Sequence, residues 1–364
     1  MNILGIETSC DETAAAVVSE TGDPARPWRI ESNIVASQVE IHREWGGVVP
    51  ELASRQHIRD ICGVVERALA EAGITTAECD AVAVTQGPGL VGSLLVGVAF
   101  GKAIAASLDV PLVPVHHLGG HIESLVLENG VLPLPAVALV VSGGHTSLYH
   151  VPQEGTYHLI GRTRDDAAGE AFDKVATLMG LDYPGGPVID RLAREGNDQA
   201  IPLPVPRMTH TDRNQGPPMA TPAGFAGKMG GRTEFSFSGL KTAVKRIVVA
   251  RRLELGTDRL PDEDIRDMCA SFQRVVVETL LDRTFDAARL FGARSVGIAG
   301  GVSANSRLRT EAGERGASTG LAVFLPSLAL ATDNAAMIAA AGLRNLRAGV
   351  TASLDLNAQA ALDL

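Results

Sequence analysis

Short apolar segments alternate along the chain with longer segments in which apolar residues recur every three or four positions. The short segments are typical of buried strands, and the longer ones of helices that pack one face against a sheet. Predicted strands cover residues 3–6, 14–18, 29–36, 81–85, 110–115, 136–141, 146–150, 157–162, 295–299 and 322–325. The main predicted helices cover residues 50–72, 93–108 and 265–290, with a last one from about 333. This order predicts an α/β protein.

Glycine-rich turns follow three of the predicted strands, at residues 86–92, 142–144 and 300–301. Glycine at such a junction lets the backbone approach a ligand or a packed neighbour closely. Two lobes of strands followed by helices, with glycine turns facing each other, would hold a nucleotide between them. We expect the first lobe at 1–115 and the second at 116–330.

Two histidines at helical spacing are the first candidate metal ligands. His117 and His121 follow the strand predicted at 110–115 and would lie one helical turn apart on one face. Asp333, far downstream, would complete a set of two imidazoles and a carboxylate that leaves open positions for a ligand. Two alternatives remain open from the pattern. The histidines could be solvated or satisfied in a core, and Asp333 could simply cap the final helix.

The turn between the first two strands is polar and contains both Asp11 and Glu12. Backbone amides and hydroxyls in such a turn can bind phosphate oxygens, and its acids can hold Mg²⁺ beside a nucleotide. The alternative is an ordinary solvated hairpin turn.

Composition limits the class of protein. The 364 residues carry a net charge of −10, so bulk charge does not drive binding to nucleic acid, and any such contact needs a local basic patch or a basic partner. Four scattered cysteines without a CxxC pair fit a reducing compartment. We found neither a basic leader nor an apolar run of membrane-spanning length, so we expect a cytoplasmic protein without a membrane partner.

One region concentrates positive charge. Residues 202–234 are rich in Pro, Gly, Met and Thr, and we interpret them as a long loop. Cations of this loop and of the helix after it are Arg207, Arg213, Lys228, Arg232, Lys241, Lys245, Arg246, Arg251 and Arg252. They form either a contact surface for nucleic acid or an ordinary solvated face.

Eight motifs, in order from about residue 3 to about residue 345, resemble those of the Kae1/TsaD family. They are Gly5–Thr13, the His117/His121 pair, Val141–Thr146, Gly169–Lys174, Tyr183–Pro187, Phe235–Thr242, Gly300–Asn305 and Thr332–Met337. Each motif is weak alone, whereas eight in the same order are specific. Residues 207–234 look longer and richer in Pro, Gly and Met than the family pattern, so the resemblance does not cover them.

The resemblance implies a two-lobed fold of the actin/Hsp70/sugar-kinase-like (ASKHA) class with a nucleotide cleft between the lobes. It also implies that the segment from about 331 to 364 completes the first lobe. It implies transfer of a threonylcarbamoyl group from threonylcarbamoyl-AMP to N6 of adenosine 37 in tRNAs that read codons beginning with adenine. It also implies two protein partners, the paralogue TsaB at the N-terminal lobe and the ATPase TsaE.

The resemblance assigns roles by motif position. His117, His121 and Asp333 would bind Fe²⁺ or Zn²⁺, and Mg²⁺ could accompany a nucleotide. The adenylate-binding residues would be Val140, Val141, Ser142, Gly143, Gly144, Asp173, Gly186, Asp190 and Asn305. Asp11 and Glu12 would matter for activity, with either acid a candidate base toward the adenine amine, and Lys241 would lie near the cleft.

Three other functions compete with the transferase. A zinc peptidase needs His-Glu-x-x-His, but Leu118 follows His117, so the base that activates water is missing. A small-molecule kinase of the same fold would not need the His-His-Asp set. A scaffold without activity would be expected to lack the metal ligands, which are present here.

Overall fold

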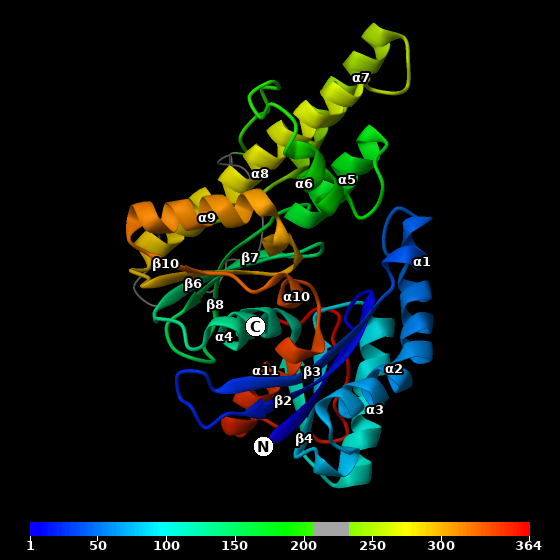
Figure 1. Cartoon of the computed structure of the whole chain (residues 1–364), viewed down its shortest axis with the longest axis vertical. Helices are drawn as coiled ribbons and strands as arrows, with labels where there is room; N and C mark the ends of the chain where they lie inside the picture. Colours follow the sequence, from blue (N-terminus) through cyan, green and yellow to red (C-terminus); the bar gives the residue numbers. More distant parts are fainter. Residues whose placement is uncertain (207–232) are drawn as a thin grey trace. The chain divides into compact units, whose positions relative to one another are not determined.

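The computed structural model describes residues 1–206 and 233–364. They form two compact units, one of residues Met1–Leu132 with Pro326–Leu364 and the other of Pro133–Leu325 (Figure 1). Arg207, Arg213, Lys228 and Arg232 of the predicted loop lie outside the described residues.

The first unit is built on a five-stranded sheet with the order β3-β2-β1-β4-β5. Its strands are β1 (Asn2–Glu7), β2 (Glu12–Glu20), β3 (Trp28–Ser37), β4 (Ala81–Gly87) and β5 (Leu112–His116). Strand β1 pairs antiparallel with β2 and parallel with β4, which in turn pairs parallel with β5. The carboxyl ends of β1, β4 and β5 therefore share one edge, where functional side chains of an α/β sheet usually gather.

Helices cover both faces of this sheet. The helices of this unit are α1 (Val39–Arg43), α2 (Pro50–Ala72), α3 (Val91–Leu108), α4 (His117–Asn129), α10 (Leu328–Ala331) and α11 (Ala335–Arg347), with a 3-10 turn η1 at Thr76–Glu78. Leu4 and Ile6 of β1 cluster with apolar residues of α2. Gly5 faces the other way, where an added Cβ would lie 2.6 Å from the backbone oxygen of Ala335 in α11. The alternation along β1 thus reflects a sheet buried on both faces.

Helix α3 is the one described helix that is long and apolar enough to cross a membrane by length and composition alone. This corrects the expectation that no apolar run of such length is present. In the structure α3 packs on β4 and α2, and the missing side chain of Gly101 lets it approach Val84 closely. These contacts are those of a helix packed on a sheet, although only 33% of the apolar segment Val91–Leu108 is buried in the chain.

The second unit contains a five-stranded sheet with the order β10-β9-β6-β7-β8. Its strands are β6 (Ala136–Val141), β7 (Thr146–Val151), β8 (His158–Arg162), β9 (Ser295–Ala299) and β10 (Ala322–Phe324). Its helices are α5 (Ala168–Met179), α6 (Gly185–Ala193), α7 (Ser238–Leu255), α8 (Asp262–Leu290) and α9 (Ser306–Thr319), with a 3-10 turn η3 at Gly301–Ala304. Phe272 of the long helix α8 is fully buried and meets Phe172 of α5 edge to face, with ring centroids 5.2 Å apart.

All ten predicted strands are present, but the division into units falls later than expected. The sequence prediction puts residues 116–132 in the second lobe. In the structure α4 packs against α11, so this segment belongs to the first unit. No local pattern announces that contact, because the two helices are separated by some two hundred residues.

Candidate metal centre and surrounding acids

Helix α4 begins at His117, directly after strand β5. The preceding residue, His116, caps the helix by accepting a hydrogen bond from the backbone N–H of Leu118 at its Nδ1, with a distance of 3.2 Å. Glycines then let α4 approach α11, since a Cβ at Gly120 would lie 2.9 Å from the end of the Ile338 side chain. This packing carries His117 and His121 toward the segment that precedes α11.

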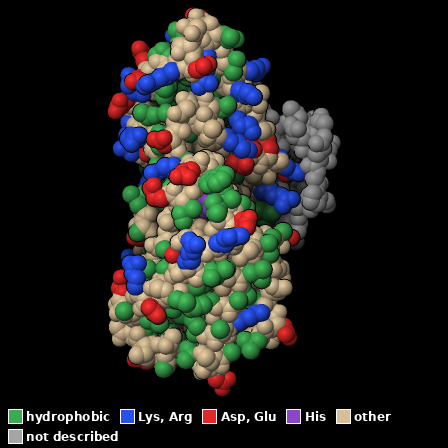
Figure 2. Space-filling view, turned by 90° about the vertical axis from the view of Figure 1, so that its right-hand side faces the viewer, with side chains coloured by type: hydrophobic (Ala, Val, Ile, Leu, Met, Phe, Trp, Pro, Cys, Tyr) green, Lys and Arg blue, Asp and Glu red, His purple; other side chains and the backbone are tan. Residues whose placement is uncertain are grey.

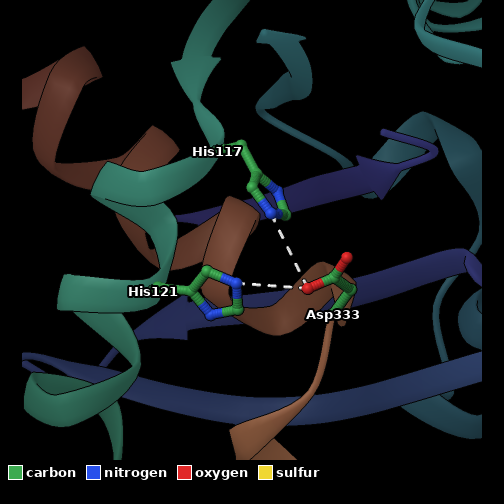
Figure 3. Close-up of side chains that lie close together, drawn as sticks. All are labelled: His117, His121 and Asp333. Carbon is green, nitrogen blue, oxygen red and sulfur yellow. Dashed lines mark ion pairs between the residues drawn. The ribbon is translucent and has the colours of Figure 1, made fainter. Parts of the chain in front are cut away.

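Asp333 lies in the short turn between α10 and α11. The cap of α11 is its neighbour Asn334, whose side chain accepts a hydrogen bond from the backbone N–H of Met337 at 3.0 Å. The capping interpretation of Asp333 is therefore wrong. Its carboxylate is instead directed at the two histidines of α4 (Figure 3).

The three side chains converge on one point. Oδ1 of Asp333 lies 3.1 Å from Nε2 of His121 and 3.7 Å from Nε2 of His117. One ligand atom from each residue falls within 4.8 Å of the others, which is a spacing that a single metal ion can bridge. Two imidazole nitrogens and a carboxylate oxygen suit Fe²⁺ or Zn²⁺ and leave positions open for another ligand.

Burial favours a metal over a satisfied pair of core histidines. His121 is fully buried, and within the described chain neither of its ring nitrogens makes a hydrogen bond. The 3.1 Å approach of Nε2 to Asp333 meets the distance for an ion pair but not the geometry of a hydrogen bond. A buried nitrogen without a partner costs free energy, and a bound cation would remove that cost. The three residues thus fit a metal ion.

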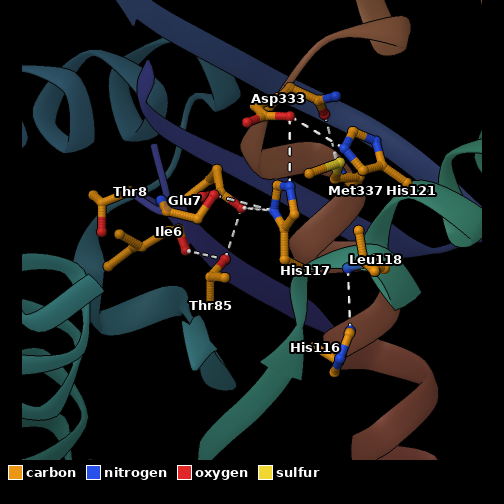
Figure 4. A network of polar contacts seen from close by, with 12 residues as sticks. Ile6, Glu7, Thr8, Thr85, His116, His117, Leu118, His121, Asp333 and Met337 are labelled. Carbon is orange, nitrogen blue, oxygen red and sulfur yellow. Dashed lines mark hydrogen bonds and ion pairs between the residues drawn. The ribbon is translucent and has the colours of Figure 1, made fainter. Parts of the chain in front are cut away.

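The residues behind His117 were not predicted from the sequence. Nδ1 of this ring lies 3.0 Å from Oε2 of Glu7 at the end of β1 (Figure 4). The same nitrogen lies 3.2 Å from the Ser9 hydroxyl. Thr85 of β4 donates to the same Glu7 oxygen at 2.8 Å. A carboxylate on the far nitrogen is the usual device for orienting a metal-binding histidine. The contact follows from the order of strands β1, β4 and β5 in the sheet, and the sequence alone does not reveal that order.

Two carboxylates dominate the electrostatics of His117. Burial alone would lower the pKa of this imidazole, but Asp333 and Glu7 together raise it to about 9. In the absence of a cation the ring therefore holds a proton at neutral pH. Neighbouring His116 behaves oppositely, since burial lowers its pKa to about 4.

The acid turn after β1 is buried, which contradicts the solvated-turn alternative. Asp11 is 8% exposed. Burial, together with the charges of Asp11 and Asp333, raises the pKa of Glu12 well above its usual value. The same causes raise the pKa of the Cys10 thiol. An acidic cluster of this kind is a place where a cation is stabilised.

Helix α2 braces this turn from the other side. His57, which is fully buried, lies 2.8 Å from the Thr13 hydroxyl through Nδ1 and 3.0 Å from the carbonyl of Cys10 through Nε2. These contacts fix both ends of the segment that contains Asp11 and Glu12. No motif or spacing in the sequence marks His57 for this role.

The predicted adenylate residues all lie in the second unit. Val140 and Val141 end strand β6, and the turn Ser142–Gly144 follows it. A Cβ at Gly143, Gly144 or Gly186 would meet nothing within 4 Å, so these backbones border open space. Such glycines let a ligand reach backbone amides.

Polar residues near these glycines tie the local elements together. Asp173 accepts from the backbone N–H of Gly185 at 2.7 Å, and Asp190 accepts from the Ser306 hydroxyl at 2.7 Å. Asn305 caps α9 and donates to the buried side chain of Gln273 at 2.9 Å. The contacts of Asp173 and Asp190 thus join α5 to α6 and α6 to α9.

Lys241 is engaged by an acid. Its Nζ lies 2.7 Å from Oδ2 of Asp166, whose other oxygen accepts from Lys174. Burial would raise the pKa of Asp166, but the two lysines hold it below its usual value.

The basic helix is less uniformly available than its sequence suggests. Arg251 of α7 pairs with Asp264 and Glu254, and Arg252 donates to the carbonyl of Leu178. Lys245 and Arg246 are exposed. Only part of the predicted positive patch therefore faces solvent.

Fold and site together define an α/β protein of the actin-like class with a candidate His-His-Asp metal centre. A family model for tRNA N6-adenosine threonylcarbamoyltransferase, TsaD, matches residues 29–340. A protein of that name from Symbiobacterium thermophilum is 50% identical over 362 residues, covering 100% of this chain and 96% of that protein. Another from Moorella thermoacetica is 49% identical over 358 residues, covering 98% and 95%. The chain belongs to the tRNA N6-adenosine threonylcarbamoyltransferase family.

Solved structures bear out the fold class. Component A of the (R)-2-hydroxyglutaryl-CoA dehydratase of Acidaminococcus fermentans aligns with a TM-score of 0.50 at 13% identity, covering 94% of this chain and 96% of that one. At this identity the likeness shows the ASKHA fold alone. Family membership makes the chain a transferase that modifies adenosine in tRNA, and it favours this function over the kinase alternative.

Proposed function

We propose that this chain transfers the threonylcarbamoyl group of threonylcarbamoyl-AMP to N6 of adenosine 37 in tRNAs reading codons that begin with adenine, and releases AMP. The observation that carries the proposal is the convergence of His117, His121 and Asp333 in a chain of this family, with the nitrogens of His121 buried and without hydrogen bonds among the described residues. A purely structural histidine pair would have no need of that arrangement.

The three ligands would hold one divalent transition metal ion, Fe²⁺ in our proposal, with Zn²⁺ as the alternative. Bound there, the ion would supply Lewis acidity toward an oxygen of the acyl-adenylate. Glu7 would orient His117 through Nδ1, so that the Nε2 lone pair is the one offered to the ion.

Glu12 is our candidate for the base that receives a proton from the adenine amine. The amine is a poor nucleophile, and it loses a proton as its nitrogen bonds to the carbamoyl carbon. A carboxylate whose pKa is raised accepts a proton more readily than an ordinary one, and burial and its acidic neighbours raise the pKa of Glu12. Asp11 is the alternative base.

The second unit would bind the adenylate. The backbones of Gly143, Gly144 and Gly186 border open space, which suits the approach of a nucleotide to the turn that follows Val140 and Val141. Asp173, Asp190 and Asn305 would provide the polar contacts. Within the described chain, Oδ2 of Asp190 pairs with the exposed side chain of Arg194 at 3.1 Å, a surface pair that ribose hydroxyls could replace at little cost. Mg²⁺ would accompany a nucleotide with free phosphates.

Lys241 is the third catalytic candidate. Its ion pair with Asp166 holds the ammonium group in one place, and Asp166 also binds Lys174. A positioned cation of this kind can neutralise charge that develops on a phosphate leaving group.

An apolar face on the first unit supports a protein partner. Ile58 of α2 and Val91 and Leu95 of α3 are 64%, 52% and 45% exposed. Figure 2 shows hydrophobic side chains gathered over this part of the molecule. We propose that TsaB covers them, and that TsaE acts with the pair.

Replacing Leu95 by Asp should then prevent co-purification with TsaB, whereas the same change at exposed Leu354 should not.

A transfer assay tests the function. The chain and its TsaB and TsaE partners would be mixed with threonylcarbamoyl-AMP and unmodified tRNA, and the nucleosides analysed by mass. We expect modified adenosine with the wild type and none with His117→Ala or Asp333→Ala, while Glu31→Gln, outside the site, serves as a matched control. ATP-dependent phosphorylation of a small molecule without any modified adenosine would instead support the kinase.

A further inference from the structure

The last residues of the chain run along the glycine turn after β4 and reach the start of α4. Ala352 pairs with Leu112 of the edge strand β5, where its N–H donates to the Leu112 carbonyl at 2.8 Å. Further on, the N–H of Gln359 donates to the carbonyl of Gln86 at 2.8 Å. The fit is close, because a Cβ at Gly87 would lie 2.0 Å from the Gln359 oxygen. The segment 357–364, called the C-terminal strap here, is thus built into the first unit.

The strap contacts His116, the residue directly before a metal ligand. Nε2 of His116 lies 2.9 Å from the carbonyl oxygen of Leu362. Since Nδ1 accepts from the Leu118 N–H, the proton of the neutral ring must be on Nε2, which donates to Leu362. One imidazole therefore caps α4 and ties its first turn to the strap. The Leu364 side chain also lies against Gly119 of this turn, 3.2 Å from where a Cβ would be.

A second route leads from the strap to the same ligand. The carbonyl of Ala360 accepts from the N–H of Gly89 at 3.2 Å, and the next residue, Leu90, donates its N–H to the carbonyl of Ser9 at 2.8 Å. The hydroxyl of Ser9 lies 3.2 Å from Nδ1 of His117. One of these two routes thus ends on the ring of His117, and the other ends on His116 and Leu118, the residues on either side of it.

We propose that the C-terminal strap positions the metal site, with His116 as the positioning residue through which it acts on His117. A metal site loses affinity when a ligand must be reoriented on binding, and groups that fix a ligand from behind commonly change metal affinity 10- to 100-fold. His116 makes no contact with the ion in this account. The strap fixes the first turn of α4, and this turn sets the direction of the His117 ring.

Zn²⁺ affinity of two variants and their combination tests the proposal. His116→Asn keeps a good helix cap but is too short to reach Leu362. A chain ending at Ala361 keeps His116 and loses Leu362–Leu364. We expect each change to weaken Zn²⁺ binding about tenfold in competition with a chelating dye. The combination should be no weaker than the shortened chain alone, because that chain already lacks the contact that His116→Asn breaks. Leu354→Ala, an exposed position before the strap, should bind as the wild type does.

Several outcomes would overturn this role of the strap. A hundredfold loss in the combined variant would mean that two independent effects are at work, and unchanged affinity in His116→Asn would exclude His116 as the positioning residue. Thermal unfolding of each metal-free variant separates loss of fold from loss of affinity. If the shortened chain does not fold, His116→Asn alone decides the question.

The inference rests on the proposed metal site, and the same titration separates the two. A wild type that binds no Zn²⁺ would refute the metal site and the strap together. A wild type that binds Zn²⁺, with variants that bind equally well, would refute the strap only. The absorption spectrum of bound Co²⁺ adds a readout of ligand geometry, which should change in His116→Asn and stay unchanged in Leu354→Ala.

Discussion

Glu7 and His117 are separated by more than a hundred residues, yet Oε2 of Glu7 lies 3.0 Å from Nδ1 of His117. The opposite nitrogen of the ring faces Asp333. With a metal ion bound, each nitrogen of this imidazole would have its own task, with the proton on the Nδ1 that faces Glu7 and the lone pair on the Nε2 that faces the ligand position. The end of strand β1 thereby enters the metal centre, although Glu7 is not itself a candidate ligand.

Replacing Glu7 by Gln should weaken metal binding without removing a ligand. The amide keeps the size of the side chain but no longer offers a charged acceptor to His117, so the ring is held less firmly. We expect about a tenfold loss of Zn²⁺ affinity, measured by competition with a chelating dye. Glu31→Gln on strand β3 is the control. Equal affinity in Glu7→Gln and the wild type would show that Glu7 does not orient the ligand.

The metal-free protein should depend on pH through His117. Its pKa is about 9 in the folded chain, above the value of about 6.5 expected when unfolded. Protonation of this ring therefore contributes stability that is fully present below about pH 6.5 and is lost as pH rises through about 9. The difference in thermal midpoint between the wild type and His117→Asn should shrink between these pH values. A difference independent of pH would show that the ring does not titrate there.

Glu12→Gln should make the fold more stable and the enzyme slower. Burial and repulsion from Asp11 and Asp333 raise the pKa of Glu12, so its charged form is less stable in the folded chain than in the unfolded chain. Removing that charge should stabilise the metal-free chain by on the order of 1 kcal/mol, which corresponds to about 2–4 °C in midpoint.

The rate of single-turnover transfer with saturating adenylate and tRNA tests whether Glu12→Gln slows the enzyme. If Glu12 is the base, the rate should fall by about 10²–10⁴-fold in Glu12→Gln. Normal rates would leave Asp11 as the remaining candidate. Glu31→Gln should neither raise the midpoint nor slow the transfer.

The strands were predictable because each follows a local rule. Apolar runs such as residues 136–141 are buried on both sides of a sheet, and that pattern is visible without any knowledge of the fold. The spacing of His117 and His121 was equally local. Their contact with Asp333 depends on how α4 packs against α11, so no local pattern predicts it. The family resemblance is what assigned the three residues to one site.

The contacts between distant segments could not be predicted from the sequence. Glu7 and His57 look like ordinary residues of a strand and a helix. Their roles appear only when the sheet brings the end of β1 near His117 and α2 packs against β2. For the basic helix, the sequence predicted more than the structure shows. Counting charges treated Arg251 and Arg252 as free cations, whereas Arg251 pairs with an acid and Arg252 donates to a backbone carbonyl.

Lys245 and Arg246 are therefore the cations of α7 that we expect to contact tRNA. Both are exposed, and neither belongs to an ion pair among the described residues, whereas Arg251 is held by two acids. Reversing both charges to Glu should weaken tRNA binding and lower the dependence of log affinity on log salt by about 1 for each phosphate that is no longer neutralised.

Arg259→Glu is the matched control, because Arg259 is an exposed cation just beyond the same helix and pairs with exposed Asp262. Affinity and salt dependence should be measured over several salt concentrations with the TsaB partner present. If the double variant loses no more than twice the log affinity that the control loses, the effect is one of net charge, and this face of α7 does not bind tRNA.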